Sequence, residues 1–160
     1  MPLRRLVTSV AVVVFGLLLV AACTATTSVE GWPRFHAGKT FSFSAPFELK
    51  GGPGQGIDSF VGRYSMPGIM ISFDYGWYTG CNPRREEKVH IPGAREASLT
   101  VGHRAAAESD SLPYTVVLCA TTRADKKITL GMFAECASPE RQAVAIRILK
   151  SVALTSGAHR

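Results

Sequence analysis

The sequence lacks the short motifs that usually reveal an enzyme. It contains no His-Glu-x-x-His and no two histidines four residues apart, so ligand spacing points to no metal site. It also has no Gly-x-Ser-x-Gly elbow for a nucleophilic serine, and no Cys-x-x-Cys for a redox pair or a zinc ribbon. The glycine-rich run 51–56 lacks the Lys-Ser or Lys-Thr pair of a phosphate-binding loop, so we predict an ordinary loop there. We therefore predict no catalytic residue, no metal and no cofactor.

A basic stripe interleaved with aromatic residues is also missing, and we predict that the chain binds no nucleic acid. The 160 residues include 18 Lys and Arg against 12 Asp and Glu, for a formal net charge of +6. Arg4 and Arg5 account for two of the basic residues, and the chain after residue 22 therefore carries four more basic than acidic residues. This moderate charge favours solubility and some attraction to anionic headgroups.

The longest apolar run is too short for a spanning helix. Residues 10–22 are all apolar or glycine, whereas a membrane-spanning helix needs about 20 such residues. Arg4 and Arg5 precede the run, and the small residues Ala21 and Ala22 close it just before Cys23. A positive start, an apolar middle and a small-residue end are typical of an export signal that is processed.

The run Val20-Ala21-Ala22-Cys23 resembles the lipobox of bacterial prolipoproteins, with Val20 where leucine is commonest. The resemblance implies that diacylglycerol is attached to the Cys23 thiol and that a peptidase cuts just before it. The alternative is a secreted protein with an ordinary Ala-x-Ala cleavage site. Thr24 stands where the Gram-negative pattern has an Asp that retains lipoproteins in the inner membrane. We expect a lipid anchor in the cell membrane or the outer membrane, with the chain facing the periplasm or the exterior. In a source with two membranes, Thr24 favours the outer one.

The remaining chain predicts one α+β domain, an antiparallel β-sheet covered by a C-terminal amphipathic helix. We divide the sequence into a signal peptide (1–22), a flexible tether (23–31), a single domain (32–155) and a tail (156–160). Period-two alternation and turn residues predict the strands. Those strands are 40–47, 57–65, 69–78, 89–91, 97–103, 114–121 and 128–136.

Ser138 as N-cap and Pro139 at the first helical position predict a helix that runs to about residue 152. Its apolar stripe, formed by Ala145, Ile148, Leu149 and Val152, should dock on the sheet. The closing strand-strand-helix unit, which ends Ile-Leu-Lys-Ser-Val, is faintly similar to small PsbP-like envelope domains over about the last 45 residues. That resemblance implies an accessory or assembly factor without chemistry of its own.

The cysteines predict one disulfide in an exported chain. With Cys23 given to the lipid, Cys81, Cys119 and Cys136 remain. In a hairpin of 114–121 with 128–136, Cys136 should lie opposite residue 114, too far along the ladder from Cys119 and on the other face. We predict Cys81–Cys136 first and Cys81–Cys119 second, with three free thiols as the remaining alternative.

Tyr75, Trp77 and Tyr78 form the aromatic cluster most suited to a binding surface. Alternation directs Tyr75 and Trp77 toward the core and leaves Tyr78 outside, so core packing competes with ligand contact. Asp58 and Asp74 should fall on opposite faces of their hairpin, which argues against a catalytic carboxylate pair.

Two functions remain open. The first is a non-catalytic envelope lipoprotein that binds a protein or another envelope component of unknown identity. The second is a small periplasmic hydrolase or metal-dependent enzyme whose site residues are dispersed in the sequence.

Overall fold

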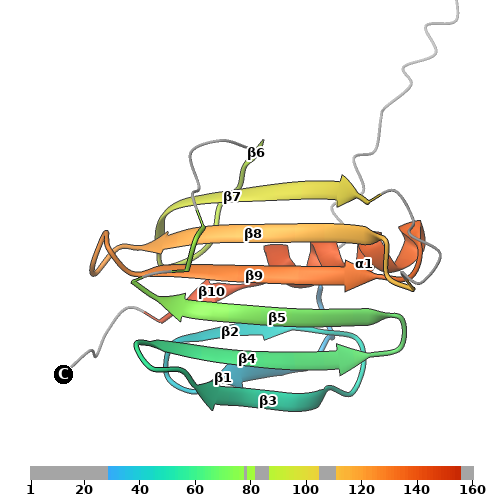
Figure 1. Ribbon diagram of the computed structural model, residues 1–160, viewed down its shortest axis with the longest axis horizontal. Coiled ribbons are helices and arrows are strands. Elements are labelled where there is room, and N and C mark those ends of the chain that lie inside the picture. The colour runs from blue at the N-terminus through green and yellow to red at the C-terminus, as the bar shows by residue number, and fades with distance from the viewer. Residues whose placement is uncertain (1–28, 78, 82–86, 105–110, 156–160) are drawn as a thin grey trace, which may run out of the picture.

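The computed structural model describes residues 29–77, 79–81, 87–104 and 111–155. These residues form two layers (Figure 1). A seven-stranded antiparallel sheet is one layer, and a three-stranded sheet with helix α1 packs against one of its faces. We call that covered face the inner face and the opposite one the outer face.

The large sheet has the spatial order β3-β4-β5-β9-β8-β7-β6, and the small sheet has the order β1-β2-β10. The elements are β1 (Arg34–Ala37), β2 (Phe41–Ser44), β3 (Lys50–Gln55), β4 (Ser59–Met66), β5 (Ile69–Gly76), β6 (Glu87–Lys88), β7 (Ala94–His103), β8 (Tyr114–Thr122), β9 (Thr129–Cys136), α1 (Pro139–Lys150) and β10 (Ala153–Leu154). The structure agrees in outline with the predicted α+β class, because it has an antiparallel sheet and one C-terminal helix. Strands make up more than half of the described residues.

Helix α1 begins and docks as its sequence predicts. The Ser138 side chain caps it by accepting a hydrogen bond from the Arg141 backbone N–H at 3.3 Å. The apolar stripe is fully buried. Ser151 ends the helix, and its hydroxyl accepts a hydrogen bond from the backbone N–H of Ser44 at 2.8 Å, which ties the helix end to β2.

The core lies between the two layers. Alternate residues of the central strands point inward and are buried, among them Ile71, Phe73, Val116, Leu118, Leu130 and Met132. Two aromatic contacts join the sheets: Phe41 meets Phe73 edge-on at 5.0 Å between ring centroids, and Phe43 meets Tyr64 at 5.4 Å. Burial of this apolar surface is the main stabilising contribution to the fold.

The hairpin of β8 and β9 has the predicted register, with Tyr114 opposite Cys136. For the hairpin of β4 and β5, the sequence predicts that residues 64 and 69 pair across the turn; in the structure Met66 pairs with Ile69 around a two-residue turn, a shift of two residues. Gly68 occupies that turn with φ +71°, a conformation that glycine adopts without strain. A shift of two residues leaves every side chain on its predicted face.

The glycine-rich segment is a strand rather than the predicted loop. Residues Lys50–Gln55 form β3, which pairs with β4 at the edge of the large sheet. Pro53 is tolerated because an edge strand has one side without a ladder partner. Gly51 lies so close to the Arg63 carbonyl that a Cβ there would clash with its oxygen. Glycine is therefore required for this pairing.

The bounds of four other strands differ from prediction. β2 covers only Phe41–Ser44, and its serines are buried because the strand is central in the small sheet and the Arg34 Nε donates to Ser42 Oγ at 3.0 Å. β7 starts at Ala94 instead of residue 97, and the short strand before it is Glu87–Lys88 instead of 89–91. β5 ends at Gly76, two residues earlier than predicted.

Candidate functional site

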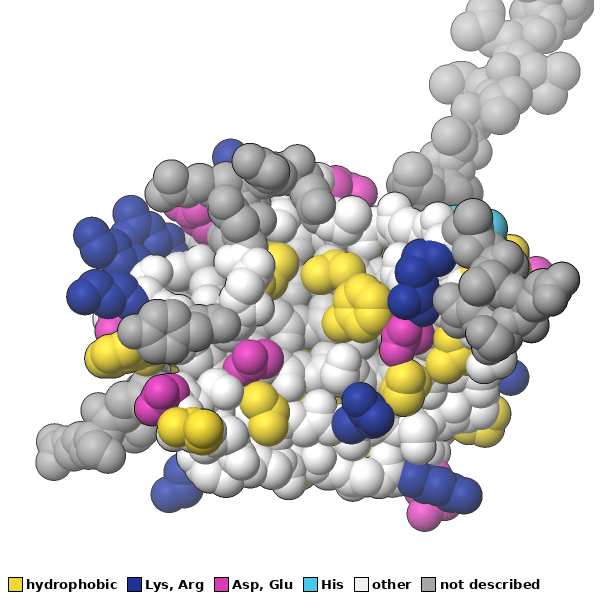
Figure 2. Space-filling model, viewed as in Figure 1, with side chains coloured by type: hydrophobic (Ala, Val, Ile, Leu, Met, Phe, Trp, Pro, Cys, Tyr) yellow, Lys and Arg dark blue, Asp and Glu magenta, His cyan; other side chains and the backbone are white. Residues whose placement is uncertain are grey.

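The outer face of the large sheet differs in composition from the inner one. Figure 2 views it directly and shows a mixed surface, with a few hydrophobic side chains near the middle and charged side chains around them. No described helix or strand packs on this face; α1 and the small sheet lie on the other side (Figure 1). The chain segment after β5 does cross it, and the candidate sites lie beside that segment.

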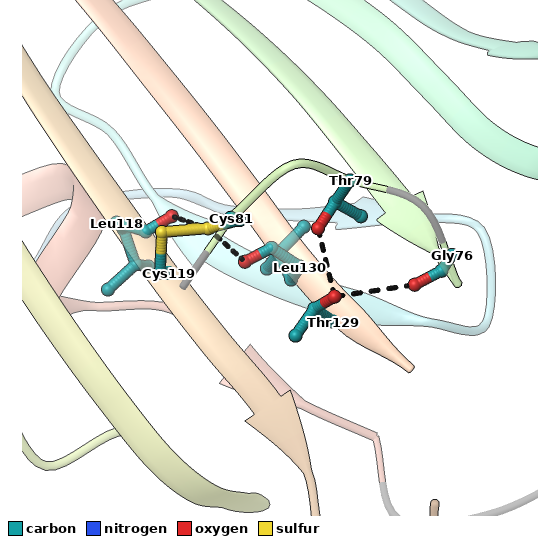
Figure 3. The surroundings of a disulfide bond; sticks show 7 residues. All are labelled: Gly76, Thr79, Cys81, Leu118, Cys119, Thr129 and Leu130. Carbon is teal, nitrogen blue, oxygen red and sulfur yellow. Dashed lines mark hydrogen bonds between the residues drawn. A yellow bond between two sulfur atoms is a disulfide. The ribbon is translucent and has the colours of Figure 1, made fainter. Parts of the chain in front are cut away.

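We call residues 77 and 79–81 the strap. It leaves the end of β5 and crosses the outer face of β9, where Gly131 makes room: a Cβ at Gly131 would lie 3.5 Å from the Cβ of Cys81. Figure 3 shows its two attachments. The Thr79 and Thr129 hydroxyl groups share a hydrogen bond of 2.9 Å, and Cys81 is joined to Cys119 of β8 by a disulfide.

The first-choice disulfide, Cys81–Cys136, is wrong. The structure has Cys81–Cys119, the second choice, with 5.6 Å between the Cα atoms. The strap crosses the outer face, where Cys119 points, whereas Cys136 points into the core and is fully buried as a free thiol. Burial, with a smaller contribution from Glu135, raises the pKa of Cys136 to about 11. A thiol in that setting is protonated at neutral pH and unreactive.

Beside the strap lies the outer hollow, a cavity of about 610 Å³. Its lining residues on the sheet come from four adjacent strands, β5, β9, β8 and β7, and include Ser72, Asp74, Gly131, Phe133, Val117 and Thr100. Asp74 is half-buried, and its Oδ1 is a buried atom with no hydrogen-bond partner among the described residues.

A second cavity of about 610 Å³ lies where β5 ends, and we call it the end notch. Tyr75 and Trp77 line it, together with Ile57 and the acidic residues Asp58 and Asp125. Ile57 is 99% exposed and Trp77 is 60% exposed. Among the described residues, the two cavities have no lining residue in common.

The prediction that Tyr75 and Trp77 are both buried is confirmed for Tyr75 only. Tyr75 is buried, as alternation predicts, and burial raises the pKa of its hydroxyl group. Core packing of Trp77 was wrong, because β5 ends at Gly76 and the alternation ends with it. Tyr78 and the lipobox cysteine, Cys23, lie outside the described residues.

Sequence reasoning missed two residues of these sites. The sequence offers Asp74 only as a neighbour of Asp58, and its position opposite Gly131 on β9 cannot be read from the sequence. The sequence predicts a strand at Ile57, although the neighbouring Gly56 is a signal that the chain turns there.

No described group of three or more His, Cys, Asp and Glu side chains is placed to hold a metal ion. None of the helices in the described part of the chain is long and apolar enough to cross a membrane.

The chain matches no protein-family model, no curated protein and no solved structure.

Proposed function

We propose that this chain is a lipid-anchored lipoprotein of the cell envelope that acts as a non-catalytic binding module. The run that ends at Cys23 supports the anchor by its resemblance to a lipobox. The Cys81–Cys119 disulfide supports an oxidising compartment, where such bonds persist.

The observation that carries the binding function is the end notch. The described residues include three exposed large hydrophobic side chains, and two of them, Ile57 and Trp77, line this one cavity. Single exposed apolar residues are common on protein surfaces, whereas a tryptophan beside a second apolar side chain at a cavity is typical of an interaction site.

The chemistry of the notch favours a protein partner. Trp77 and Ile57 offer an apolar contact, and Asp58 and Asp125 border it with negative charge. A partner segment with an apolar side chain flanked by Lys or Arg complements this arrangement. The second function, a dispersed hydrolase or metal-dependent enzyme, gains no specific support from these residues.

The docking proposal is tested by truncating the notch in the full chain. Cross-linking in intact cells should yield a defined complex whose amount falls strongly in Trp77→Ala and in Ile57→Ser. Loss of a central tryptophan weakens a protein interface by about 2 kcal/mol or more, which is roughly thirtyfold in Kd. Val101→Ser is the matched control, since Val101 is the third exposed hydrophobic residue (48%) and lies in β7, away from the notch. Equal loss in Val101→Ser, or no loss in the notch variants, would contradict the proposal.

The anchor is tested separately with Cys23→Ser. Metabolic labelling with an alkyne fatty acid should mark the wild-type chain and leave the variant unlabelled, because serine offers no thiol for the diacylglycerol group. Acylation of Cys23→Ser at the wild-type level would refute the anchor and would leave the docking proposal standing.

A further inference from the structure

The outer hollow contains one row of four side chains that crosses four adjacent strands. In the middle of the row, Phe133 of β9 lies opposite Val117 of β8. Ser72 of β5 continues the row beside Phe133, and Thr100 of β7 continues it beside Val117. All four side chains line the hollow and are half-buried. Because neighbouring strands lie about 4.8 Å apart, the row extends about 14 Å and has a hydroxyl group at each end.

The apolar middle of this row is not part of the core. Phe133 and Val117 point to the outer face, which no described helix or strand covers, and Figure 2 shows hydrophobic side chains near the middle of that face. An apolar pair that borders a cavity on an uncovered face is typical of a binding site. The cavity volume of about 610 Å³ falls in the range of small-molecule sites, about 300–1,000 Å³.

The strap gives the hollow a fixed wall beside the row. Thr79, Gly80 and Cys81 all line the cavity, and the disulfide to Cys119 holds this segment against the sheet. The hydrogen bond between the hydroxyl groups of Thr79 and Thr129 fixes the strap at a second point (Figure 3). A wall that is already held in place loses little conformational entropy when a ligand binds.

The charges around the row favour a ligand without a negative charge. Asp74 is the one charged residue in the described lining, and its carboxylate repels anions. Its buried Oδ1 is closed to the cavity and cannot accept from a ligand. On the side of the row away from the strap, Glu135 is already paired with Arg104 at 2.7 Å. Hydroxyl groups, which both donate and accept, are therefore the polar groups that the row offers.

We propose that the outer hollow binds a neutral glycan through two adjacent sugar rings. The C–H face of one ring packs on the aromatic ring of Phe133, and sugar hydroxyl groups exchange hydrogen bonds with Ser72 and Thr100 at the ends of the row. A single sugar ring is too short to reach both ends of a row of about 14 Å, whereas two linked rings extend far enough for their outer hydroxyl groups to do so. The described lining contains neither Trp77 nor Ile57, so this site does not depend on docking at the end notch.

The test is an amide NMR titration of the purified full chain with three neutral disaccharides: cellobiose, maltose and diacetylchitobiose. At least one should give saturable shifts with a Kd of about 10 mM or lower, largest at the amides of Phe133 and Val117. Glucose should bind at least about tenfold more weakly, because one ring cannot reach both hydroxyl groups. Benzyl alcohol, which offers a ring with a single hydroxyl group, should not shift these amides.

Variants separate the ring from the hydroxyl groups. Phe133→Ala should weaken disaccharide binding by about threefold to tenfold, and Phe133→Tyr should restore it, because tyrosine keeps the aromatic face. Thr100→Val keeps the shape of the side chain and should weaken binding by about fivefold through the lost hydroxyl group. Trp77→Ala, at the end notch, is the control and should bind sugar as the wild type does.

Four results would overturn the proposal. They are the absence of saturable shifts with all three disaccharides up to about 100 mM, equal binding of glucose, tighter binding of benzyl alcohol at the same amides, and a Kd unchanged in both Phe133→Ala and Thr100→Val. If Phe133→Ala does not fold, an unchanged Kd in Thr100→Val is by itself the contradicting result. Loss of the cross-linked complex in Trp77→Ala with sugar binding intact would show that the two sites act separately.

Discussion

The two faces of the large sheet differ in what their side chains do: the inner face packs into the core, and the outer face carries the strap and the hollow. On the inner face, neighbouring strands contribute matched apolar residues, such as Leu118 opposite Met132, and both are fully buried. On the outer face, the adjacent positions hold small, polar or cross-linked residues, such as Cys119 opposite Gly131. Because side chains alternate, stability is concentrated in every second residue. The intervening residues are left available for the strap and the hollow.

The sharpest test of this contrast compares two adjacent residues of β8. Leu118→Ala should lower the free energy of unfolding by about 2–5 kcal/mol, because it leaves a cavity in the core. Val117→Ala, on the outer face, should cost about 1 kcal/mol or less, since its side chain already borders a cavity. Urea unfolding of the full chain measures both, and equal losses would show that the outer face is packed as the core is.

The disulfide is the next largest effect. Cys81→Ser combined with Cys119→Ser removes a cross-link between residues 38 apart in the sequence, and should destabilise the chain by about 2–4 kcal/mol. The strap should also become a better protease substrate, because the Thr79–Thr129 hydrogen bond is its other described attachment. Thermal unfolding with limited proteolysis tests this, and reduction of the wild type should reproduce the effect. Unchanged stability would mean that the strap contributes nothing to the fold.

The free thiol on the inner face predicts a dependence on pH. The folded pKa of Cys136 is raised to about 11, so its thiolate is disfavoured in the folded state. This contribution to stability is fully present below the unfolded pKa, about 9, and is lost as pH rises toward 11. The slope is about 1.4 kcal/mol per pH unit, or about 2–3 kcal/mol over the window.

Urea unfolding between pH 8 and pH 10 should therefore show a steeper loss in the wild type than in Cys136→Ala, which has no thiol to ionise. Comparing how steeply the free energy of unfolding falls with pH removes the constant free-energy cost of the smaller side chain in Cys136→Ala. It also cancels the contributions of Tyr64 and Tyr75, whose pKa values burial raises. Parallel pH profiles would contradict the prediction.

Two glycines give the smallest and most local test. A Cβ at Gly62, on the inner face, would lie 2.5 Å from the ring of Phe73 and 2.7 Å from the carbonyl oxygen of Gly52. Gly62→Ala should therefore cost about 1–3 kcal/mol by overpacking. A Cβ at Gly131 meets nothing closer than 3.5 Å, so Gly131→Ala should change stability by about 0.5 kcal/mol or less. Differential scanning calorimetry distinguishes the two, and a severe effect at Gly131 would mean that the strap is seated more tightly than these distances indicate.

Features that depend on residues close together in the sequence could be predicted, and features that depend on residues far apart could not. The start of α1 at Ser138 and the register of β8 with β9 depend on residues close in sequence, and both are confirmed. β3 was missed because glycine and proline normally indicate a loop, and only the edge position explains their presence in a strand.

The candidate sites depend on longer-range geometry. The disulfide partner of Cys81 is decided by the path of the strap across β9, which no local pattern encodes. Trp77 belongs to the predicted aromatic cluster, but it is exposed instead of buried. Periodicity does not show that the strand ends at Gly76, one residue earlier. Asp74 could be found in the sequence as a residue, but its unmet oxygen could be found only in three dimensions.

The two edge strands that form the borders of the large sheet affect how readily separate molecules aggregate. One border is β3, whose Pro53 offers no N–H to an incoming strand, and the other is β6, only two residues long and composed of Glu87 and Lys88. Proline, charge and short length each discourage strand-to-strand growth between separate molecules. If the chain is held on a lipid surface as proposed, copies would meet edge to edge often, and these borders would disfavour the growth of fibrils from such encounters.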